Sequence, residues 1–236
     1  MLTFSLRDSS ADFYASHFDF SVAGTKAKIK TPKGIQNFDT TLIGAHNLSN
    51  ALAVLAISYG LGMEAGPVLQ TLRTARGAPG RLERPVFGNE YPAVFVDYAH
   101  TDDALKNVIE ALLKLKKTKS RLITVFGCGG DRDKTKRPKM GQVASSLSDL
   151  CVVTSDNPRT EDPIAILKDI QDGLVTGARC HLEANRKNAI EWALAEAKPE
   201  DIVLIAGKGH ETYQIIGTTQ FPFDDRKVVR DYYGLC

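Results

Sequence analysis

Long apolar runs and excess charge of either sign are both missing from this 236-residue sequence. No stretch approaches the roughly 18 uninterrupted apolar residues of a membrane-spanning helix, and the opening apolar segment is too short for the core of a signal peptide. The 30 Lys and Arg residues nearly balance the 28 Asp and Glu residues, which leaves a formal charge of +2. So small an excess gives no overall field for nucleic acid or an anionic membrane, and we expect neither as a partner.

Cysteine is also scarce, with four residues that form no C-x-x-C motif: Cys128, Cys151, Cys180 and Cys236. This spacing argues against a disulfide framework and a structural zinc site, and it fits a reducing compartment, so we expect a cytoplasmic protein. The five histidines show no H-x-x-x-H or H-E-x-x-H pattern, and no serine lies in a nucleophile elbow. We therefore assign no catalytic residue and no metal ligand.

The amino-acid composition is that of a globular protein, with 43% hydrophobic, 25% charged and 8% aromatic residues. Residues 1–43 alternate in polarity between turn signals, which predicts antiparallel strands. Apolar residues then recur at helical spacing over 45–59, and a second helix is predicted over 67–76. The Gly77-Ala78-Pro79-Gly80 segment interrupts the pattern, and we place a domain boundary there.

Beyond Arg84 the pattern changes to alternating strands and helices. Strands are predicted over 93–96, 122–126, 150–154, 179–182 and 202–205, and helices over 103–115, 137–147, 163–171 and 184–197. A hairpin over 213–223 and a helix over 224–233 complete the pattern. Hydrophobic strands that alternate with helices predict an α/β fold, with a Rossmann-like, mainly parallel sheet covered on both faces.

Polar or glycine-rich segments follow four of these strands, beginning at Asp97, Gly127, Asp156 and Gly207. Ligands of open parallel sheets bind beyond the carboxyl ends of the strands, so these loops predict a binding site at that edge. In the loop 127–137, clustered glycines would let backbone N–H groups approach an anion, with Arg132, Lys134 and Arg137 supplying charge. The alternative is a tight turn that leads into a solvated basic helix start.

The tetrapeptide Asp156-Asn157-Pro158-Arg159 predicts a stiff loop, because Pro158 fixes its own φ and biases Asn157 toward extended backbone. A stiff loop can hold the Arg159 guanidinium for a two-pronged grip on a carboxylate. The alternative is a helix-capping turn in which Arg159 pairs with Glu161 or Asp162.

Two further segments carry weaker signals. In Gly207–Glu211, Glu211 could take a ligand ammonium and Lys208 or His210 could contact an anion, although a plain turn explains the glycines equally well. The Asn47 amide could pair with an adenine edge, but asparagine near a helix start is more often a cap.

Taken together, six segments in order resemble the Mur ligase family, and in particular its diaminopimelate-adding members. They are Gly44–Ala51, Gly80–Glu83, Val96–Thr101, Phe126–Pro138, Asp156–Glu161 and Ala206–Glu211. The resemblance implies that 1–80 is the C-terminal part of a central ATP-binding domain and that 81–236 is a C-terminal amino-acid-binding domain. It also implies a ligase that uses ATP and Mg²⁺ to form an acyl phosphate on UDP-N-acetylmuramoyl-L-alanyl-D-glutamate. The amine of meso-diaminopimelate then attacks to give an amide, as a step of peptidoglycan precursor synthesis.

The family's binding residues transfer to matching positions of this sequence. The resemblance assigns meso-diaminopimelate to Arg132, Asp156, Asn157, Pro158, Arg159, Gly207 and Glu211. It assigns the nucleotide to Asn47, Arg81, Asp97, Tyr98, His100 and Lys134. Lysine-adding relatives differ at the Asp156–Arg159 tetrapeptide, where Arg159 would meet the second carboxylate that distinguishes diaminopimelate from lysine.

The sequence also departs from the family pattern. It contains no Gly-Lys-Ser/Thr phosphate loop, and the segments that carry the magnesium ligands and the UDP-sugar domain are not found. We therefore expect a piece of a longer ligase with little activity alone. Two alternatives stay open, namely a relative with another acceptor, of the lysine-adding or folylpolyglutamate type, and a non-catalytic binding module.

Overall fold

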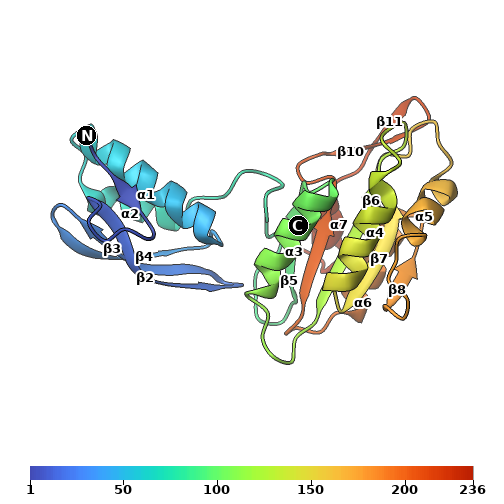
Figure 1. The fold of residues 1–236 in the computed structure, drawn as a ribbon, viewed down its shortest axis with the longest axis horizontal. Helices are drawn as coiled ribbons and strands as arrows, with labels where there is room; N and C mark the ends of the chain where they lie inside the picture. The colour runs from blue at the N-terminus through green and yellow to red at the C-terminus, as the bar shows by residue number, and fades with distance from the viewer. Residues whose placement is uncertain (236) are drawn as a thin grey trace. The chain divides into compact units, whose positions relative to one another are not determined.

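A four-stranded and a five-stranded sheet organise the chain, and a two-stranded hairpin accompanies the larger one (Figure 1). The computed structural model describes residues 1–235, and Cys236 lies outside the described residues. The chain divides into a smaller unit, Met1–Gly77, and a larger unit, Ala78–Cys236, and each has a hydrophobic core of its own. Within residues 1–235, no helix is long and apolar enough to cross a bilayer.

The smaller unit is a four-stranded sheet with two helices. The strands lie in the order β1 (Phe4–Ser5), β2 (Phe13–Ser21), β3 (Gly24–Thr31) and β4 (Gly34–Thr40). β2, β3 and β4 pair antiparallel, as the alternating pattern predicts, but β1 pairs parallel to β2, so the prediction is wrong for that strand. Thr3 and Asp12 join the starts of these two strands, because the Thr3 N–H and hydroxyl both donate to Asp12 Oδ2 at 2.8 Å.

Both predicted helices of this unit are present, as α1 (Ala45–Gly60) and α2 (Ala65–Arg73). α1 buries an apolar stripe that includes Leu48, Leu52 and Leu55. This stripe shares one core with Phe13 and Ile29 of the sheet. The helical spacing in the sequence therefore reports which face of α1 meets the sheet.

The larger unit contains the predicted parallel sheet. Its strands are β5 (Ala93–Asp97), β6 (Leu122–Cys128), β7 (Leu150–Ser155), β8 (Cys180–Leu182) and β9 (Ile202–Ala206), arranged β5-β9-β6-β7-β8. All four strand pairings are parallel, which confirms the predicted fold class. Every residue of β5, β6, β7 and β9 is buried, as expected for strands covered on both faces.

Helices cover both faces of this sheet (Figure 1). One face carries α3 (Asp102–Leu113), α4 (Lys136–Leu147) and α5 (Pro163–Gln171), and the other carries α6 (Arg186–Glu196) and α7 (Asp225–Tyr232). The predicted hairpin forms from β10 (Tyr213–Ile216) and β11 (Thr219–Pro222). The next helix after β6 is α4 and the next helix after β9 is α7, and these two helices cover opposite faces of the sheet. Because β6 and β9 are neighbouring strands, the gap between their carboxyl ends is the position where such folds bind ligands.

A fully buried ion pair ties the carboxyl edge of this sheet to the helices. Arg186 Nη2 lies 2.8 Å from Asp225 Oδ2, and neither side chain is exposed. Arg186 also donates to the carbonyl oxygens of Ser155 and Ala206, the last residues of β7 and β9. One guanidinium therefore holds two strand ends on either side of β6, a role that sequence analysis missed because its partners lie far apart in the chain.

We predict that Arg186→Met destabilises the larger unit by about 3–5 kcal/mol, because it leaves the Asp225 carboxylate buried without a cation. The sequence has one tryptophan, Trp192, which lies in α6, so its fluorescence during urea unfolding reports on this unit. The control Lys227→Met breaks an exposed pair with Asp231 and should cost at most about 1 kcal/mol. Equal losses in the two variants would contradict the role given to Arg186.

Candidate functional site at the carboxyl edge of the parallel sheet

The loops that follow β6, β7 and β9 are joined by direct contacts. The Gly130 N–H donates to the Asn157 carbonyl at 2.9 Å, and Asn157 Nδ2 donates to Glu211 Oε2 at 3.0 Å. The first bond joins the loops after β6 and β7, and the second joins the loops after β7 and β9. The structure therefore assembles the predicted cluster from residues as far apart in the sequence as Gly130 and Glu211.

The glycine-rich loop after β6 packs against the loop after β7. A Cβ at Gly130 would lie 1.8 Å from the Pro158 carbonyl oxygen, and one at Gly127 would lie 2.2 Å from that of Thr154. The N–H groups of Gly130 and Asp131 donate to Asn157 and Glu161. The expectation that these backbone groups face an anion is therefore wrong for both residues, because neighbouring loops already use them.

Cys128, at the start of this loop, is a buried thiol. It contacts Met140 Sδ at 3.6 Å. Burial raises its pKa to about 12. The thiol is therefore protonated at neutral pH, and it is no nucleophile there.

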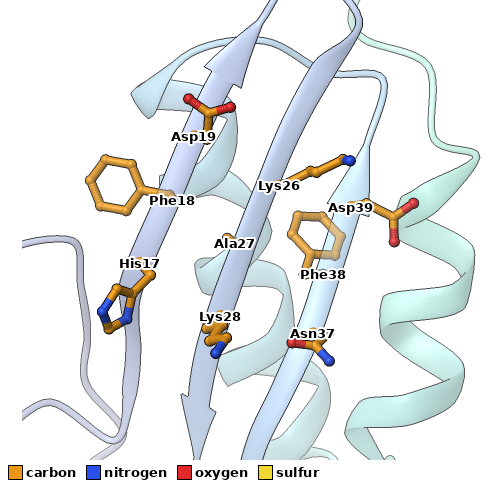
Figure 2. Close-up of a pocket in the computed structure, with 9 residues that line it drawn as sticks. All are labelled: His17, Phe18, Asp19, Lys26, Ala27, Lys28, Asn37, Phe38 and Asp39. Atoms are coloured by element: carbon orange, nitrogen blue, oxygen red, sulfur yellow. The ribbon is translucent and has the colours of Figure 1, made fainter.

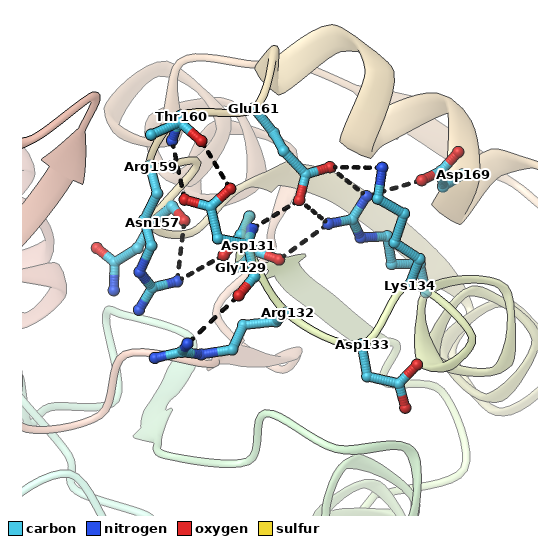
Figure 3. Close-up of polar contacts among 12 residues, drawn as sticks. Gly129, Asp131, Arg132, Asp133, Lys134, Asn157, Arg159, Thr160, Glu161 and Asp169 are labelled. Carbon is cyan, nitrogen blue, oxygen red and sulfur yellow. Dashed lines mark hydrogen bonds and ion pairs between the residues drawn. The ribbon is translucent and has the colours of Figure 1, made fainter.

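Arg137, which was expected to face a ligand, pairs with Glu161 beside this loop. Figure 3 shows the polar contacts around Glu161. The Arg137 side chain is fully buried, and its Nη2 lies 2.8 Å from Glu161 Oε1 while its Nη1 lies 2.7 Å from Asp169 Oδ2. Lys134 also approaches Glu161, at 3.1 Å, with its own side chain largely exposed. The hydrogen bond from Arg137, followed by that from the Asp131 N–H, lowers the Glu161 pKa to about 2.

Arg159 is held by its backbone and leaves most of its guanidinium unbonded. Its N–H donates to the Ile215 carbonyl and its own carbonyl accepts from the Gly217 N–H, with φ at 51°. Nη1 donates to the Gly130 carbonyl at 2.8 Å, whereas Nε and Nη2 make no hydrogen bond among residues 1–235. The alternative that Arg159 pairs with Glu161 or Asp162 is wrong, since Glu161 binds Arg137 and Asp162 caps α5.

One further predicted ligand residue, Arg132, lies near Arg159. A Cβ at Gly129 would lie 3.0 Å from Arg159 Nη1 and 3.7 Å from Arg132 Cγ, which places Arg132 next to the same glycine. The Arg132 side chain reaches along the loop and donates to the Asp131 carbonyl at 3.3 Å (Figure 3). The structure thus brings two guanidinium groups to one side of the glycine-rich loop.

Asp156 lies against the loop that follows β9. A Cβ at Gly207 would lie 2.5 Å from Asp156 Oδ2, and the φ of +117° at Gly207 favours glycine whatever the space. The Gln214 amide donates to the Asp156 carbonyl at 2.7 Å. Sequence analysis missed Gln214, which lies in the hairpin and holds this loop.

Lys208 does not reach solvent, and the expectation that it contacts an anion is wrong. Its side chain is fully buried, with Nζ 2.9 Å from Asn157 Oδ1 and 3.0 Å from Glu211 Oε2. His210, two residues on, is exposed and lies 5.2 Å from the Tyr98 ring.

Aromatic and basic groups gather at the end of β5, where Arg81 and His100 are exposed and Tyr98 is half-buried. The Tyr98 ring lies 4.6 Å from His100 and 5.5 Å from the Arg81 guanidinium carbon. Asp97 is buried, and its two oxygens accept from the Ala99 and Leu82 N–H groups. Asp97 therefore shapes the turns that present Arg81 and Tyr98.

The remaining predicted nucleotide residue, Asn47, lies in the smaller unit. Its Nδ2 donates to the Ile43 carbonyl at 2.8 Å, which leaves Oδ1 without a hydrogen bond among residues 1–235. The amide is thus held at one end by the segment before α1. The simple capping role is not seen, because the helix N-cap is Gly44.

An open groove of about 600 Å³ lies over the sheet of the smaller unit (Figure 2). None of the predicted site residues lines it. Cross-strand partners of alternating charge, Asp19, Lys26 and Asp39, run across β2, β3 and β4 there. Opposite charges thus alternate across the strands, and Asp39 is paired with Arg73 at 3.1 Å, so the groove presents no charge of a single sign to select a ligand.

The fold and the joined loops define a doubly wound α/β domain whose candidate site lies at the carboxyl edge of its sheet. A family model described as "Mur ligase, glutamate ligase domain" matches residues 80–209. The chain therefore belongs to the Mur ligase family.

Curated relatives are similar over nearly all of this chain. The chain is 46% identical to UDP-N-acetylmuramoyl-L-alanyl-D-glutamate–2,6-diaminopimelate ligase of a Synechocystis strain, over 97% of this chain and 45% of the relative. The same-named protein of Bacillus velezensis is 45% identical, over 97% and 46%. The chain thus spans just under half the length of these relatives.

Solved structures agree with this fold. A structure of UDP-N-acetylmuramoyl-L-alanyl-D-glutamate–2,6-diaminopimelate ligase is similar with a TM-score of 0.79 and 38% identity, over 99% of this chain and 47% of that one. Folylpolyglutamate synthase from Thermotoga maritima has a TM-score of 0.65 at 17% identity, over 83% of this chain and 44% of that one, and shows the shared fold alone.

We predict that Glu161→Gln destabilises the larger unit in a pH-dependent way. The folded pKa of Glu161 is about 2, below the ordinary value of 4.5, so the ionised form stabilises the fold. That contribution is complete above the ordinary value and is lost as the pH falls through the folded pKa. The difference in unfolding free energy between wild type and variant, followed by Trp192 fluorescence, should therefore shrink between pH 4.5 and about 2.

The control for this prediction is Glu191→Gln, which removes a more exposed carboxylate paired with Lys187 on α6. Its effect on stability should be small at every pH. A Glu161→Gln difference that stays constant from neutral pH to pH 2 would contradict the role of the carboxylate charge.

Proposed function

We propose that this chain is the acceptor-binding part of an ATP-dependent Mur ligase that joins meso-diaminopimelate to UDP-N-acetylmuramoyl-L-alanyl-D-glutamate in the cytoplasm. The names of the 44–48% identical relatives support this substrate pair. The observation that carries the proposal is the Arg159 guanidinium, held by its backbone with Nε and Nη2 unbonded among residues 1–235. A planar donor fixed in this way fits a carboxylate bidentately.

The chemistry of the surrounding groups suits a zwitterion. Arg159 and Arg132 offer positive charge to the distal carboxylate of diaminopimelate, and Glu211 offers an acceptor to the distal ammonium. Asp156, Asn157, Pro158 and Gly207 shape the loops between them. Lysine carries the ammonium but lacks that carboxylate, so the arginines account for discrimination between the two amino acids.

We infer that ATP would lie near the end of β5. Tyr98 and His100 present ring faces and Arg81 a positive charge there, which fits a nucleotide. Family resemblance alone assigns Asn47 and Lys134 to the nucleotide, and Asp97 holds the turns after β5. Within residues 1–235, no three His, Cys, Asp or Glu side chains cluster to hold a metal ion. Mg²⁺, bound with ATP, would neutralise phosphate charge.

The assignment of the two units follows from the same resemblance. We propose that residues 1–80 are the end of the central ATP-binding domain and that 81–236 are the amino-acid-binding domain. A free chain would then bind the acceptor without completing the reaction, since the sequence contains no Gly-Lys-Ser/Thr phosphate loop.

We predict that meso-diaminopimelate binds the purified chain more tightly than lysine does, and that Arg159→Ala removes this preference. Loss of a charge-assisted bidentate contact of about 1.5–3 kcal/mol corresponds to roughly 10- to 100-fold in affinity. The affinity for lysine, which lacks the distal carboxylate, should change little. Isothermal titration of both proteins with both amino acids measures this.

The matched control is Arg179→Ala, which removes an exposed arginine just before β8, at the opposite edge of the sheet. It should keep the preference for meso-diaminopimelate. Equal affinities of the wild-type chain for the two amino acids would overturn the proposed specificity. A preference for lysine in this titration, or for glutamate in a further one, would favour a relative with another acceptor.

A further inference from the structure

Lys208 places a fully buried ammonium group directly beneath the loops of the candidate site. A buried charge is costly unless it is paired and hydrogen-bonded. Lys208 Nζ meets this requirement through Asn157 Oδ1 at 2.9 Å and Glu211 Oε2 at 3.0 Å, and it lies 5.6 Å from the centre of the Tyr213 ring. Its partners come from the loop after β7 and from its own loop after β9, so the ammonium joins these two loops.

The contact with Asn157 completes a set of bonds that defines the orientation of its carboxamide. Oδ1 accepts from Lys208 Nζ and from the Ile215 N–H at 3.0 Å, while Nδ2 donates to Glu211 Oε2. Two donors therefore face the oxygen and a carboxylate faces the nitrogen. A flipped carboxamide would oppose like groups at all three contacts.

The contact between Lys208 and Glu211 makes the two carboxylate oxygens of Glu211 unequal. Oε2 accepts from both Lys208 Nζ and Asn157 Nδ2, whereas Oε1 makes no hydrogen bond among residues 1–235. The Glu211 side chain is 17% exposed and that of Lys208 is 0% exposed. The Glu211 carboxylate, which carries the unbonded Oε1, therefore reaches the surface. Lys208, which holds this carboxylate, is not exposed.

We propose that Lys208 is a positioning residue for the amino-acid site, an inference that rests on the proposed function. It fixes Glu211 Oε2 and Asn157 Oδ1, so that Glu211 Oε1 is presented to the ammonium of a zwitterionic ligand. Lys208 does not touch the ligand, because its own ammonium is enclosed by the residues it holds. Its effect on binding therefore passes through Glu211 and depends on the ligand's ammonium.

The test uses the chain of residues 1–236 and two probes, meso-diaminopimelate and L-2-aminopimelate, which lacks the distal ammonium. Lys208→Met keeps an apolar stem and removes the charge. It should weaken meso-diaminopimelate binding by about tenfold or more and that of L-2-aminopimelate by about threefold or less. A loss caused by general destabilisation would affect both probes equally, and equal losses would overturn the proposal.

The control is Arg121→Met, which breaks the pair with Asp201 at the amino edge of the same sheet. Arg121 Nη2 lies 2.7 Å from an Asp201 carboxylate that is 1% exposed, so this variant also leaves a buried carboxylate unpaired. It should lose stability without changing the ratio of the two affinities. A changed ratio would show that destabilisation alone alters selectivity, which would also overturn the proposal.

A second measurement does not depend on ligand binding. The Asn157 side-chain NH₂ signals, identified by their loss in Asn157→Asp, should exchange with water about tenfold faster in Lys208→Met than in wild type, because the carboxylate that accepts from Nδ2 is released. Unchanged exchange would overturn the positioning role. If the wild-type chain bound neither probe, the proposed function would fail while this measurement would still decide the role of Lys208.

A double variant covers the case in which Lys208→Met does not fold. Lys208→Met/Glu211→Gln leaves no unpaired buried carboxylate, and its reference is Glu211→Gln, which retains Lys208. Faster exchange of the Asn157 NH₂ protons in the double variant than in its reference supports the proposal. Equal exchange rates in these two proteins contradict it.

Discussion

Three buried cations hold together the carboxyl edge of the parallel sheet. Arg137, Arg186 and Lys208 are each at most 1% exposed, and each is paired with a carboxylate or amide from a loop or helix distant in sequence or across a turn. Isolated charges could not be buried there, so the loops must close around them and supply a carboxylate or amide partner to each cation. The positions of the loop backbones, and hence of the exposed side chains on them, follow from these pairings.

Close packing acts together with these charges. The loops after β6 and β7 approach so closely that Gly127 and Gly130 have no room for a Cβ, and Gly207 lies against Asp156 in the same way. The glycines thus serve contact between loops, and the backbone N–H groups of Gly130 and Asp131 are consumed by it. Because neighbouring loops already use these N–H groups, Gly130 and Asp131 offer no backbone nest to a ligand. Side chains on the loops are left to bind it.

Periodicity in the sequence predicted most of the fold. Buried strands such as 122–126 and amphipathic helices such as 45–59 are local patterns, and the structure contains them with small shifts of their ends. Pairings across long separations could not be predicted in this way. The parallel pairing of β1, the burial of Lys208 and the bond of Arg137 to Glu161 each depend on a partner that no local pattern identifies.

The candidate site shows the same division. Pro158 signalled a stiff bend and the structure holds Arg159 there, but by hydrogen bonds to Ile215 and Gly217 of a hairpin more than 50 residues away. Once Arg137, Arg186 and Lys208 have paired with their partners, the groups that keep unused capacity on these loops include Arg159 Nε and Nη2, the exposed Arg132 and Glu211 Oε1. Two positive donors and one negative acceptor on adjoining loops match a carboxylate and an ammonium carried by one small molecule. This residual charge pattern is the physical reason to expect a zwitterion rather than a simple anion at this edge.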